Sequence, residues 1–365
     1  MAANLSDIEN SETEWIFFNV FVLMKQFMFH VMMFIIVFGV VSNSLNILIF
    51  YKMGLKDNLT ITLFSLSVSD LMYLVMRSPW VVFWFLVENY PHLNLPTNDD
   101  LLMLGPSWCA QLFYDFSAFV SVFLAVVRCA CVARPLKFKS MFTKSRTVTT
   151  LVVLFFVAMV LISPLLMIID ISWVVDPTTN ATYRSLKYSG NFQTIYKVSD
   201  IFNRNILAWL TYATMIACVV ILSSKLLAAS RFRQSLANHG LSGKVKTAQR
   251  VSRPSKSRDP STQSESAEST EKEPGRTSTK ELQVIKSVTV ICVIFIFSQL
   301  PTQAITSLRL FDSEFYDFRK YYYFYVVGNY VINTLCCFNA SVNILVHFHF
   351  NSRYREKFFD LFYRK

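Results

Sequence analysis

The sequence lacks the even alternation of apolar and polar residues that is typical of a soluble domain. Hydrophobic residues make up 53% of the 365 residues, and the mean hydropathy is +0.39. They occur in blocks of about 20 residues or more, a length that crosses a lipid bilayer as a helix. These blocks are too long for strands and lack the every-second-residue pattern of a membrane barrel. Helices are the other structure that satisfies the backbone hydrogen bonds in lipid, so we expect membrane-spanning helices.

Other absences argue against several classes of membrane protein. No internal repeat is visible, although repeats are common in secondary transporters. The apolar blocks contain neither paired aspartates nor histidine-rich metal sequences, and His347 and His349 at one helix end are too few for an intramembrane enzyme. We therefore predict no catalytic residues. The N-terminus is not basic and then apolar, as a cleavable signal peptide would be, so we expect the first span to act as a signal anchor.

What is present is a series of seven apolar blocks, which predicts an all-α bundle of seven transmembrane helices. The predicted spans are about 27–51, 59–87, 107–133, 147–170, 201–228, 283–308 and 321–349.

The distribution of charge predicts how the chain crosses the membrane. Lysine and arginine gather after the first, third and fifth spans and in the tail, whereas residues 7–14 are acidic. By the positive-inside rule, the N-terminus is then extracellular and the C-terminus cytoplasmic, which indicates a plasma-membrane protein. The net charge of +11 would face the cytosol and anionic lipid, so nucleic-acid binding is not needed to explain it.

This topology gives the segments outside the bundle. We expect an extracellular N-terminus at 1–26, a transmembrane domain at 27–350, and an amphipathic eighth helix with a short tail at 351–365. Residues 229–280 are rich in Ser, Thr, Lys and Glu, which predicts a disordered third inner loop. That loop is either a phosphorylated regulatory segment or a solvated spacer. The sequons at Asn4 and Asn180 fall outside and predict glycosylation.

Two charged residues in the spans need an explanation. Arg128 ends a long apolar run in VVRCACVARPL, and Pro135 must stop the helix soon after it. At about 1.5 Å per residue, Cys109 lies roughly 28 Å above Arg128, which is the thickness of the hydrocarbon core. Asp70, in LSVSDL, lies well inside the second span and requires a partner there.

Further runs complete the pattern. FIFSQLP carries Phe295 six residues before Pro301, and NASVNILVH carries Asn339 and Asn343. GVVSNSLNI in the first span contains Asn43. Together with the runs around Arg128 and Asp70, these resemble the signatures of rhodopsin-like (class A) G-protein coupled receptors, in order and at the right spacing. The resemblance implies a receptor that activates a heterotrimeric G protein, with arrestin and receptor kinases as possible further partners.

The resemblance also implies roles for these residues. Arg128 would hold the inactive state, here by pairing with Glu281, and would contact the G protein when the sixth helix moves; Pro301, Phe295 and Asn343 would belong to the same switch. The alternative is a boundary charge that reaches toward water. Asp70 would bind an allosteric sodium ion with Ser117, Asn339 and Asn343, or would instead be protonated and hydrogen-bonded to Asn343. No other cofactor is expected.

The outer half of the bundle should contain the ligand site, because inward-facing polar residues are frequent there. Arg77 lies two turns above Asp70 on the same helix face, and it and Asp115 either bind a peptide or small polar ligand or form a buried pair that locks two helices. Ala110 stands where amine receptors carry an aspartate, which argues against an amine ligand. The remaining candidates are Gln111, Tyr114, Gln299, Gln303, Arg309, Asn329 and Asn333.

Departures from the family pattern indicate a divergent branch. Val127 and Cys129 replace the acid and tyrosine beside Arg128, and no cysteine falls in an outer loop, so we predict no structural disulfide. The seventh-span run resembles invertebrate neuropeptide receptors of the FMRFamide type, and together with RCACVARPLKFKSMFT it resembles molluscan chemosensory receptors. A transporter or channel of polar solutes is the alternative from another class, since such proteins also place Arg and Asp in their spans.

Overall fold

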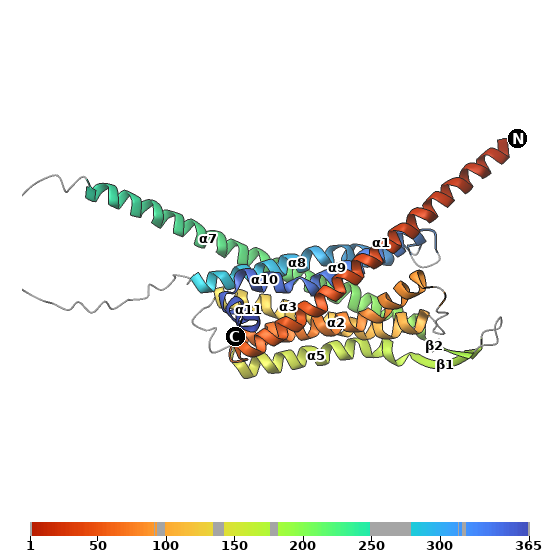
Figure 1. The fold of residues 1–365 in the computed structure, drawn as a ribbon, viewed down its shortest axis with the longest axis horizontal. Helices are drawn as coiled ribbons and strands as arrows, with labels where there is room; N and C mark the ends of the chain where they lie inside the picture. The colour runs from red at the N-terminus through yellow and green to blue at the C-terminus, as the bar shows by residue number, and fades with distance from the viewer. Residues whose placement is uncertain are drawn as a thin grey trace, which may run out of the picture.

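The computed structural model shows a bundle of long helices that run nearly side by side along the longest axis of the molecule (Figure 1). It describes residues 2–90, 92, 99–133, 142–175, 182–248, 279–312, 314–315 and 319–363. Within these ranges, the side chains of 2–17, 88, 99–104, 183, 232–248 and 279–281 lie outside the description.

The predicted fold class is confirmed. In the described part of the chain, seven helical segments are long and apolar enough to cross a membrane. Each overlaps one predicted span. They are Phe18–Met53, Asn58–Val87, Gly105–Ala133, Lys144–Met167, Phe192–Arg231, Leu282–Phe311 and Tyr322–Phe350.

The helices and strands follow the chain in a simple order. The elements are α1 (Ala2–Met53), α2 (Asn58–Asn89), α3 (Asp99–Ala133), α5 (Lys144–Met167), β1 (Ile169–Val175), β2 (Thr182–Tyr188), α6 (Phe192–Ser199), the π-helix η2 (Asp200–Leu207), α7 (Ala208–Ala248), α8 (Thr279–Phe311), α9 (Tyr322–Ser341), α10 (Asn343–Phe350) and α11 (Ser352–Tyr363). We call the end of the bundle at α11 the inner end, and the end at the β1–β2 hairpin the outer end.

Local chemistry sets several helix boundaries at the inner end. Gly54 has a φ of 83°, which lets the chain turn directly after α1. Asp57 then caps α2, because its carboxylate accepts the backbone N–H of Thr60 at 2.8 Å. Helix α3 ends at Ala133, as expected so close to Pro135.

A two-stranded hairpin forms the connection after α5, and the sequence reading did not predict it. Strands β1 and β2 pair antiparallel, with Ile169 opposite Tyr188 and Val175 opposite Thr182. Leu186 is buried against the bundle, whereas most of β1 is exposed. The hairpin therefore closes on itself at the outer end and projects from the helices (Figure 1).

Helices α1 and α7 are longer than predicted. Helix α1 begins at Ala2, so part of the expected N-terminal segment 1–26 is helical. Helix α7 continues to Ala248, into the segment 229–280 for which the sequence predicts a disordered loop. Residues 229–248 contain Ala, Leu, Gln and Lys, which favour helix, and the first proline follows only at Pro254. Residues 249–278 lie outside the described residues.

The first and seventh spans are joined by buried polar contacts rather than by apolar packing alone. The Asn43 amide donates to the Ala340 carbonyl at 2.7 Å, and the Ser42 hydroxyl donates to the Ser341 carbonyl at 3.0 Å. These bonds lie where the seventh span breaks at Val342, between α9 and α10. They fix the position of α10, which carries Asn343.

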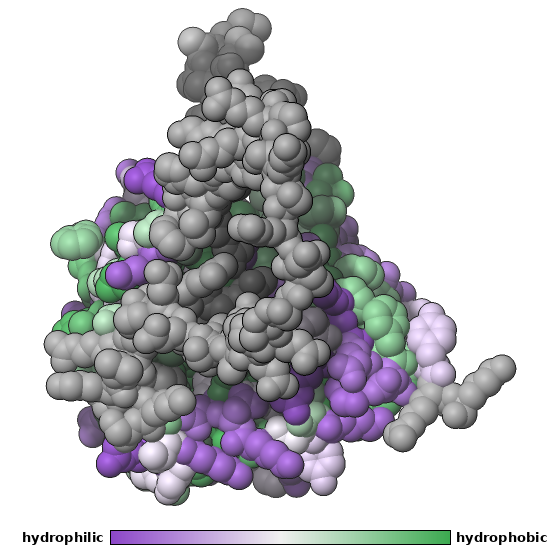
Figure 2. All heavy atoms as spheres, turned by 90° about the vertical axis from the view of Figure 1, so that its left-hand side faces the viewer, coloured by the Kyte–Doolittle hydropathy of each residue, from purple (hydrophilic) through white to green (hydrophobic). Residues whose placement is uncertain are grey.

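The short helix α11 is anchored by one buried tyrosine. Tyr354 is fully buried in the core at the inner end, and its hydroxyl donates to Asn46 Oδ1 at 2.6 Å. Burial raises the pKa of this hydroxyl, so it keeps the proton that it donates. Viewed from the inner end, the hydrophilic residues that can be seen gather mainly along the lower part of the face, and apolar residues lie at its sides (Figure 2).

Candidate functional site

A buried polar cluster surrounds Asp70 halfway along the bundle. Asp70 is 1% exposed, and its two carboxylate oxygens accept hydrogen bonds from the Ser117 hydroxyl at 2.5 Å and the Asn343 amide at 2.9 Å. The cluster therefore joins α2, α3 and α10. Asn339 is half-buried one helical turn before Asn343, and among the described residues no hydrogen bond joins it to Asp70.

Arg128 lies at the inner end of α3 and is half-buried. Glu281 lies in the first turn of α8 at the same end, but its side chain is outside the described residues, so the predicted pair with Arg128 stays a prediction. Phe295 lies in α8 six residues before Pro301 and is 3% exposed. It packs with Leu124 of α3 in a cluster of buried apolar residues near the inner end, which we call the inner core.

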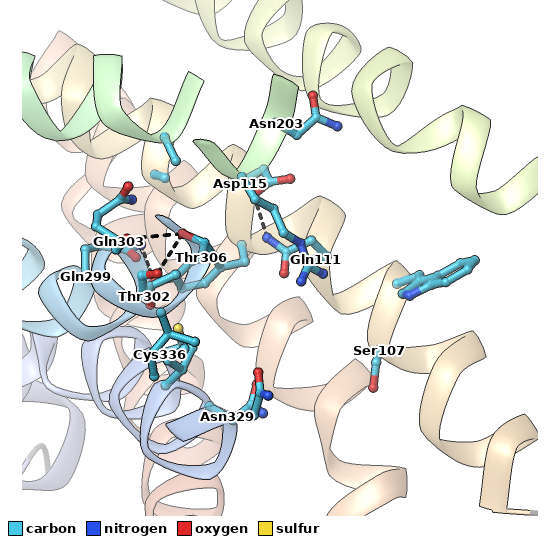
Figure 3. Close-up of a pocket in the computed structure, with 18 of the residues that line it drawn as sticks. Ser107, Gln111, Asp115, Asn203, Gln299, Thr302, Gln303, Thr306, Asn329 and Cys336 are labelled. Atoms are coloured by element: carbon cyan, nitrogen blue, oxygen red, sulfur yellow. Dashed lines mark hydrogen bonds between the residues drawn. The ribbon is translucent and has the colours of Figure 1, made fainter. Parts of the chain in front are cut away.

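A cavity of about 740 Å³ opens among the helices between this inner core and the outer end (Figure 3). Its wall is formed by residues of α2, α3, α5, α6, η2, α7, α8 and α9. Every residue that the sequence predicted for the ligand site lies on this wall: Arg77, Gln111, Tyr114, Asp115, Gln299, Gln303, Arg309, Asn329 and Asn333.

Hydrogen bonds orient several of these side chains. The Gln111 amide donates to the Asp115 carboxylate at 2.7 Å within α3 (Figure 3). The Gln299 amide of α8 donates to the Tyr114 hydroxyl of α3, which links the third and sixth spans at the cavity floor. The Gln303 side-chain oxygen is buried and has no hydrogen-bond partner among the described residues.

Arg77 and Asp115 do not pair, so the alternative of a buried pair that locks two helices is wrong. Arg77 donates from Nη1 to the Ser107 hydroxyl at 2.8 Å, and its guanidinium lies 4.4 Å from the centroid of the Trp80 ring. Asp115 has Gln111 as its hydrogen-bond partner. No ion pair joins Arg77 to Asp115 in the part of the chain that the structure describes.

The sequence reading missed Arg204, which lines the cavity, and its ion-pair partner Asp200. Asp200 accepts ion pairs from Arg204 Nε at 3.8 Å and from Arg309 Nη2 at 3.4 Å, so η2 is tied to α8. Tyr196 also interacts with Arg309, whose guanidinium lies 5.7 Å from the Tyr325 ring centroid in α9. The predicted fifth span began only at 201, which left Asp200 outside it.

The π-helical turn explains how Arg204 reaches the cavity while Asp200 remains beside it. A π-helix adds a residue to the turn and so changes which side chains face inward. The Asn205 amide donates at 3.1 Å to the Asp200 carbonyl, five residues earlier, and thereby satisfies a backbone group of the widened turn. The sequence did contain a signal for this turn, because the polar residues of DIFNRN interrupt an otherwise apolar span.

Several other predicted sites can be placed only in part. None of the seven cysteines, all of which lie in the described residues, forms a disulfide, and Cys109 is half-buried in α3. Asn180 and the side chain of Asn4 lie outside the described residues. Among the residues that the structure describes, no group of His, Cys, Asp and Glu side chains is placed to hold a metal ion.

Comparison with known proteins identifies the family. The family model "7 transmembrane receptor (rhodopsin family)" matches residues 42–342. No curated protein matches the chain. The matched range runs from within the first span to Val342 in the seventh, and it contains Asp70, Ser117, Arg128 and the residues that line the cavity. The chain therefore belongs to the rhodopsin family of seven-transmembrane receptors, multi-pass membrane proteins without enzymatic activity that bind an extracellular ligand and signal through heterotrimeric G proteins.

Proposed function

We propose that this receptor lies in the plasma membrane with its N-terminus outside, binds a peptide or small polar chemosensory ligand in the cavity, and couples to its G protein at the inner end. The basic inner segments support this orientation through the positive-inside rule. In the same orientation, the sequons at Asn4 and Asn180 face the side where glycans are added.

The observation that carries the proposal is the position and chemistry of the cavity. It has the size of a site for a small ligand, and its polar side chains come from the second, third, fifth, sixth and seventh spans. Because Gln299 bonds Tyr114 across α8 and α3, a ligand that disturbs this contact would change how the two helices pack. Phe295 lies directly between the cavity and the inner core, so such a change would reach the inner end.

At the inner end, Arg128 is the residue that we expect to contact the G protein, with Glu281 as its partner in the inactive state. The Ser- and Thr-rich residues 249–278 offer acceptor sites for receptor kinases, and phosphorylation there would add the negative charge that favours arrestin. A spacer role for this segment is the alternative.

The Asp70 cluster fits a sodium ion. Sodium prefers hard oxygen ligands, and the Asp70 carboxylate and Ser117 hydroxyl already face one another at 2.5 Å. Asn343 and the nearby Asn339 could supply further oxygens. The ion would contribute positive charge beside Asp70 and so hold α2, α3 and α10 together. Higher thermal stability in NaCl than in choline chloride, lost in Asp70→Asn, would support the site, and equal stability would contradict it.

The ligand class rests on sequence resemblance to two groups, the FMRFamide-type neuropeptide receptors and the molluscan chemosensory receptors. The polar cavity wall suits either the terminus of a peptide or a small polar solute.

One experiment separates a receptor from a transporter or channel of polar solutes, an alternative that the family does not favour. The protein is reconstituted in vesicles with a heterotrimeric G protein, and nucleotide exchange and solute flux are measured on the same preparation. We expect the receptor to accelerate exchange with no flux above protein-free vesicles. Flux without exchange would contradict the proposal.

A further inference from the structure

The charged side chains that line the cavity differ in whether carboxylates lie near them. On the side of η2 and α8, Arg204 and Arg309 share the carboxylate of Asp200. Asp115 lies within electrostatic range of Arg204, so the two arginines face two carboxylates. This group is neutral overall. Arg77 lies on α2 and belongs to no such group.

Arg77 has only neutral contacts in the structure. Its guanidinium donates to the Ser107 hydroxyl and lies over the Trp80 ring, and among the described residues its Nε is buried with no hydrogen-bond partner. Arg77 is half-buried on the cavity wall, so its guanidinium is partly removed from water without a negatively charged partner within the described ranges. An anion bound in the cavity beside it would supply that partner.

A second unsatisfied donor lies beside Arg77. The Trp80 side chain is 4% exposed, and its Nε1 also has no hydrogen-bond partner in the described part of the chain. The ring is held by Phe29 at 5.1 Å and by stacking on Tyr330 at 6.2 Å between centroids. Indole and guanidinium N–H groups only donate, so both can be satisfied by a group that only accepts.

From these contacts we propose that the ligand carries a carboxylate, and that Arg77 and Trp80 bind it. The inference rests on the proposed use of the cavity as the ligand site. A guanidinium matches a carboxylate in shape, with parallel N–H donors facing two oxygens. The ligand is thus a small organic acid, or a peptide with a free C-terminus or an acidic side chain. A peptide with an amidated end and no acidic residue lacks this group.

The test compares acids with their own amides. N-acetyl derivatives of phenylalanine, tyrosine, leucine and glycine, each as the free acid and as the carboxamide, are added to the purified receptor at equal ionic strength. Thermal unfolding then reports binding, because a ligand that binds the folded state raises the melting temperature. We expect at least one acid to bind about tenfold or more tightly than its amide, because a charge-assisted bond replaces a neutral one.

Variants locate the preference. Arg77→Gln should abolish the difference between acid and amide, Arg77→Lys should retain part of it, and Trp80→Phe should weaken it while keeping the ring. Arg184→Gln is the matched control, because Arg184 also lies over a tryptophan, Trp173 at 5.0 Å, but is exposed on the hairpin. If Arg77→Gln does not fold, the weakened preference of Arg77→Lys carries the test.

Equal melting temperatures with acid and amide across the panel, or a preference that survives in Arg77→Gln, would overturn the inference. The readout does not involve a G protein. Acid binding without nucleotide exchange would therefore count against the proposed function alone, and exchange without any acid preference would count against the carboxylate site alone.

Discussion

Asp70 joins α2 to α3 and α10 through one hydrogen bond at each carboxylate oxygen. Removing its side chain should therefore destabilise the receptor. In Asp70→Ala, the Ser117 hydroxyl and the Asn343 amide lose their buried acceptors. Each unsatisfied buried donor costs about 1–3 kcal/mol, so for the two donors we expect the free energy of unfolding to fall by roughly 2–6 kcal/mol. Denaturant or thermal unfolding of the purified receptor measures this loss.

The conservative variant serves as the control for Asp70→Ala. Asp70→Asn keeps one acceptor oxygen in place and should lose less stability than Asp70→Ala. A stability of Asp70→Ala equal to that of the unchanged receptor would mean that the cluster does not hold the helices, contrary to its geometry.

At the residue scale, the sequence predicted the cavity wall better than the contacts within it. Polar side chains in an otherwise apolar span must face protein or water, so Arg77, Gln303 and Asn333 could be assigned inward. Which of them pair depends on rotamers and helix rotation, and the Arg77–Asp115 pair was wrong for that reason. Asp200 and Arg204 were missed because a π-turn alters the helical periodicity.

At the scale of the elements, three matched variants can test how much the ion pair between η2 and α8 stabilises the receptor. Asp200 and Arg309 are 9% and 5% exposed, whereas Arg204 is 35% exposed. Removing one partner of a buried ion pair costs about 3–5 kcal/mol, but removing an exposed partner costs about 0–1 kcal/mol. We therefore expect Asp200→Asn to destabilise most, Arg309→Met less because Arg204 remains, and Arg204→Met least.

Unfolding of the three variants in one detergent gives the comparison. The reverse order, with Arg204→Met the least stable, would show that the ion pair to α8 does not fix the outer end of η2.

At the element scale, the number and order of the spans followed from hydrophobic length alone, because the bilayer fixes how many apolar residues a helix needs. The ends of the helices did not follow, since they depend on capping and on what lies beyond the membrane. The hairpin was hidden for a related reason. Its strands are short: the apolar IDISWVV follows almost directly on the fourth span, and TYRSLKY carries little hydrophobic signal.

For the whole molecule, stability should not depend on a disulfide. None of the seven cysteines, each in a described part of the chain, forms a disulfide, and Cys109 lies in α3 below the outer end. Mild reductant should leave both the melting temperature and the ligand response unchanged. A fall in either under reductant would show that Cys109 forms a bond not present in this structure.

The inactive state should also be weakly held. Val127 replaces the acid that normally stands beside Arg128, and it is 7% exposed inside the bundle. Glu281 is then the expected partner, and an ion pair at a wet helix end contributes about 0–1 kcal/mol, or up to about fivefold in the ratio of states. We expect Glu281→Ala to raise basal nucleotide exchange and Val127→Asp to lower it, at matched surface level. Equal basal exchange rates in the unchanged receptor and the two variants would show that neither acid controls the balance between the inactive and active states.

The most direct test of signalling through the inner end is basal nucleotide exchange by the unchanged receptor and by Arg128→Ala, at matched amounts of folded protein in G-protein vesicles. Arg128 lies at the inner end of α3, away from the cavity, so its loss should leave ligand binding and surface expression intact. The account predicts that Arg128→Ala lowers exchange to the rate of receptor-free vesicles. Exchange by Arg128→Ala at the rate of the unchanged receptor would contradict it.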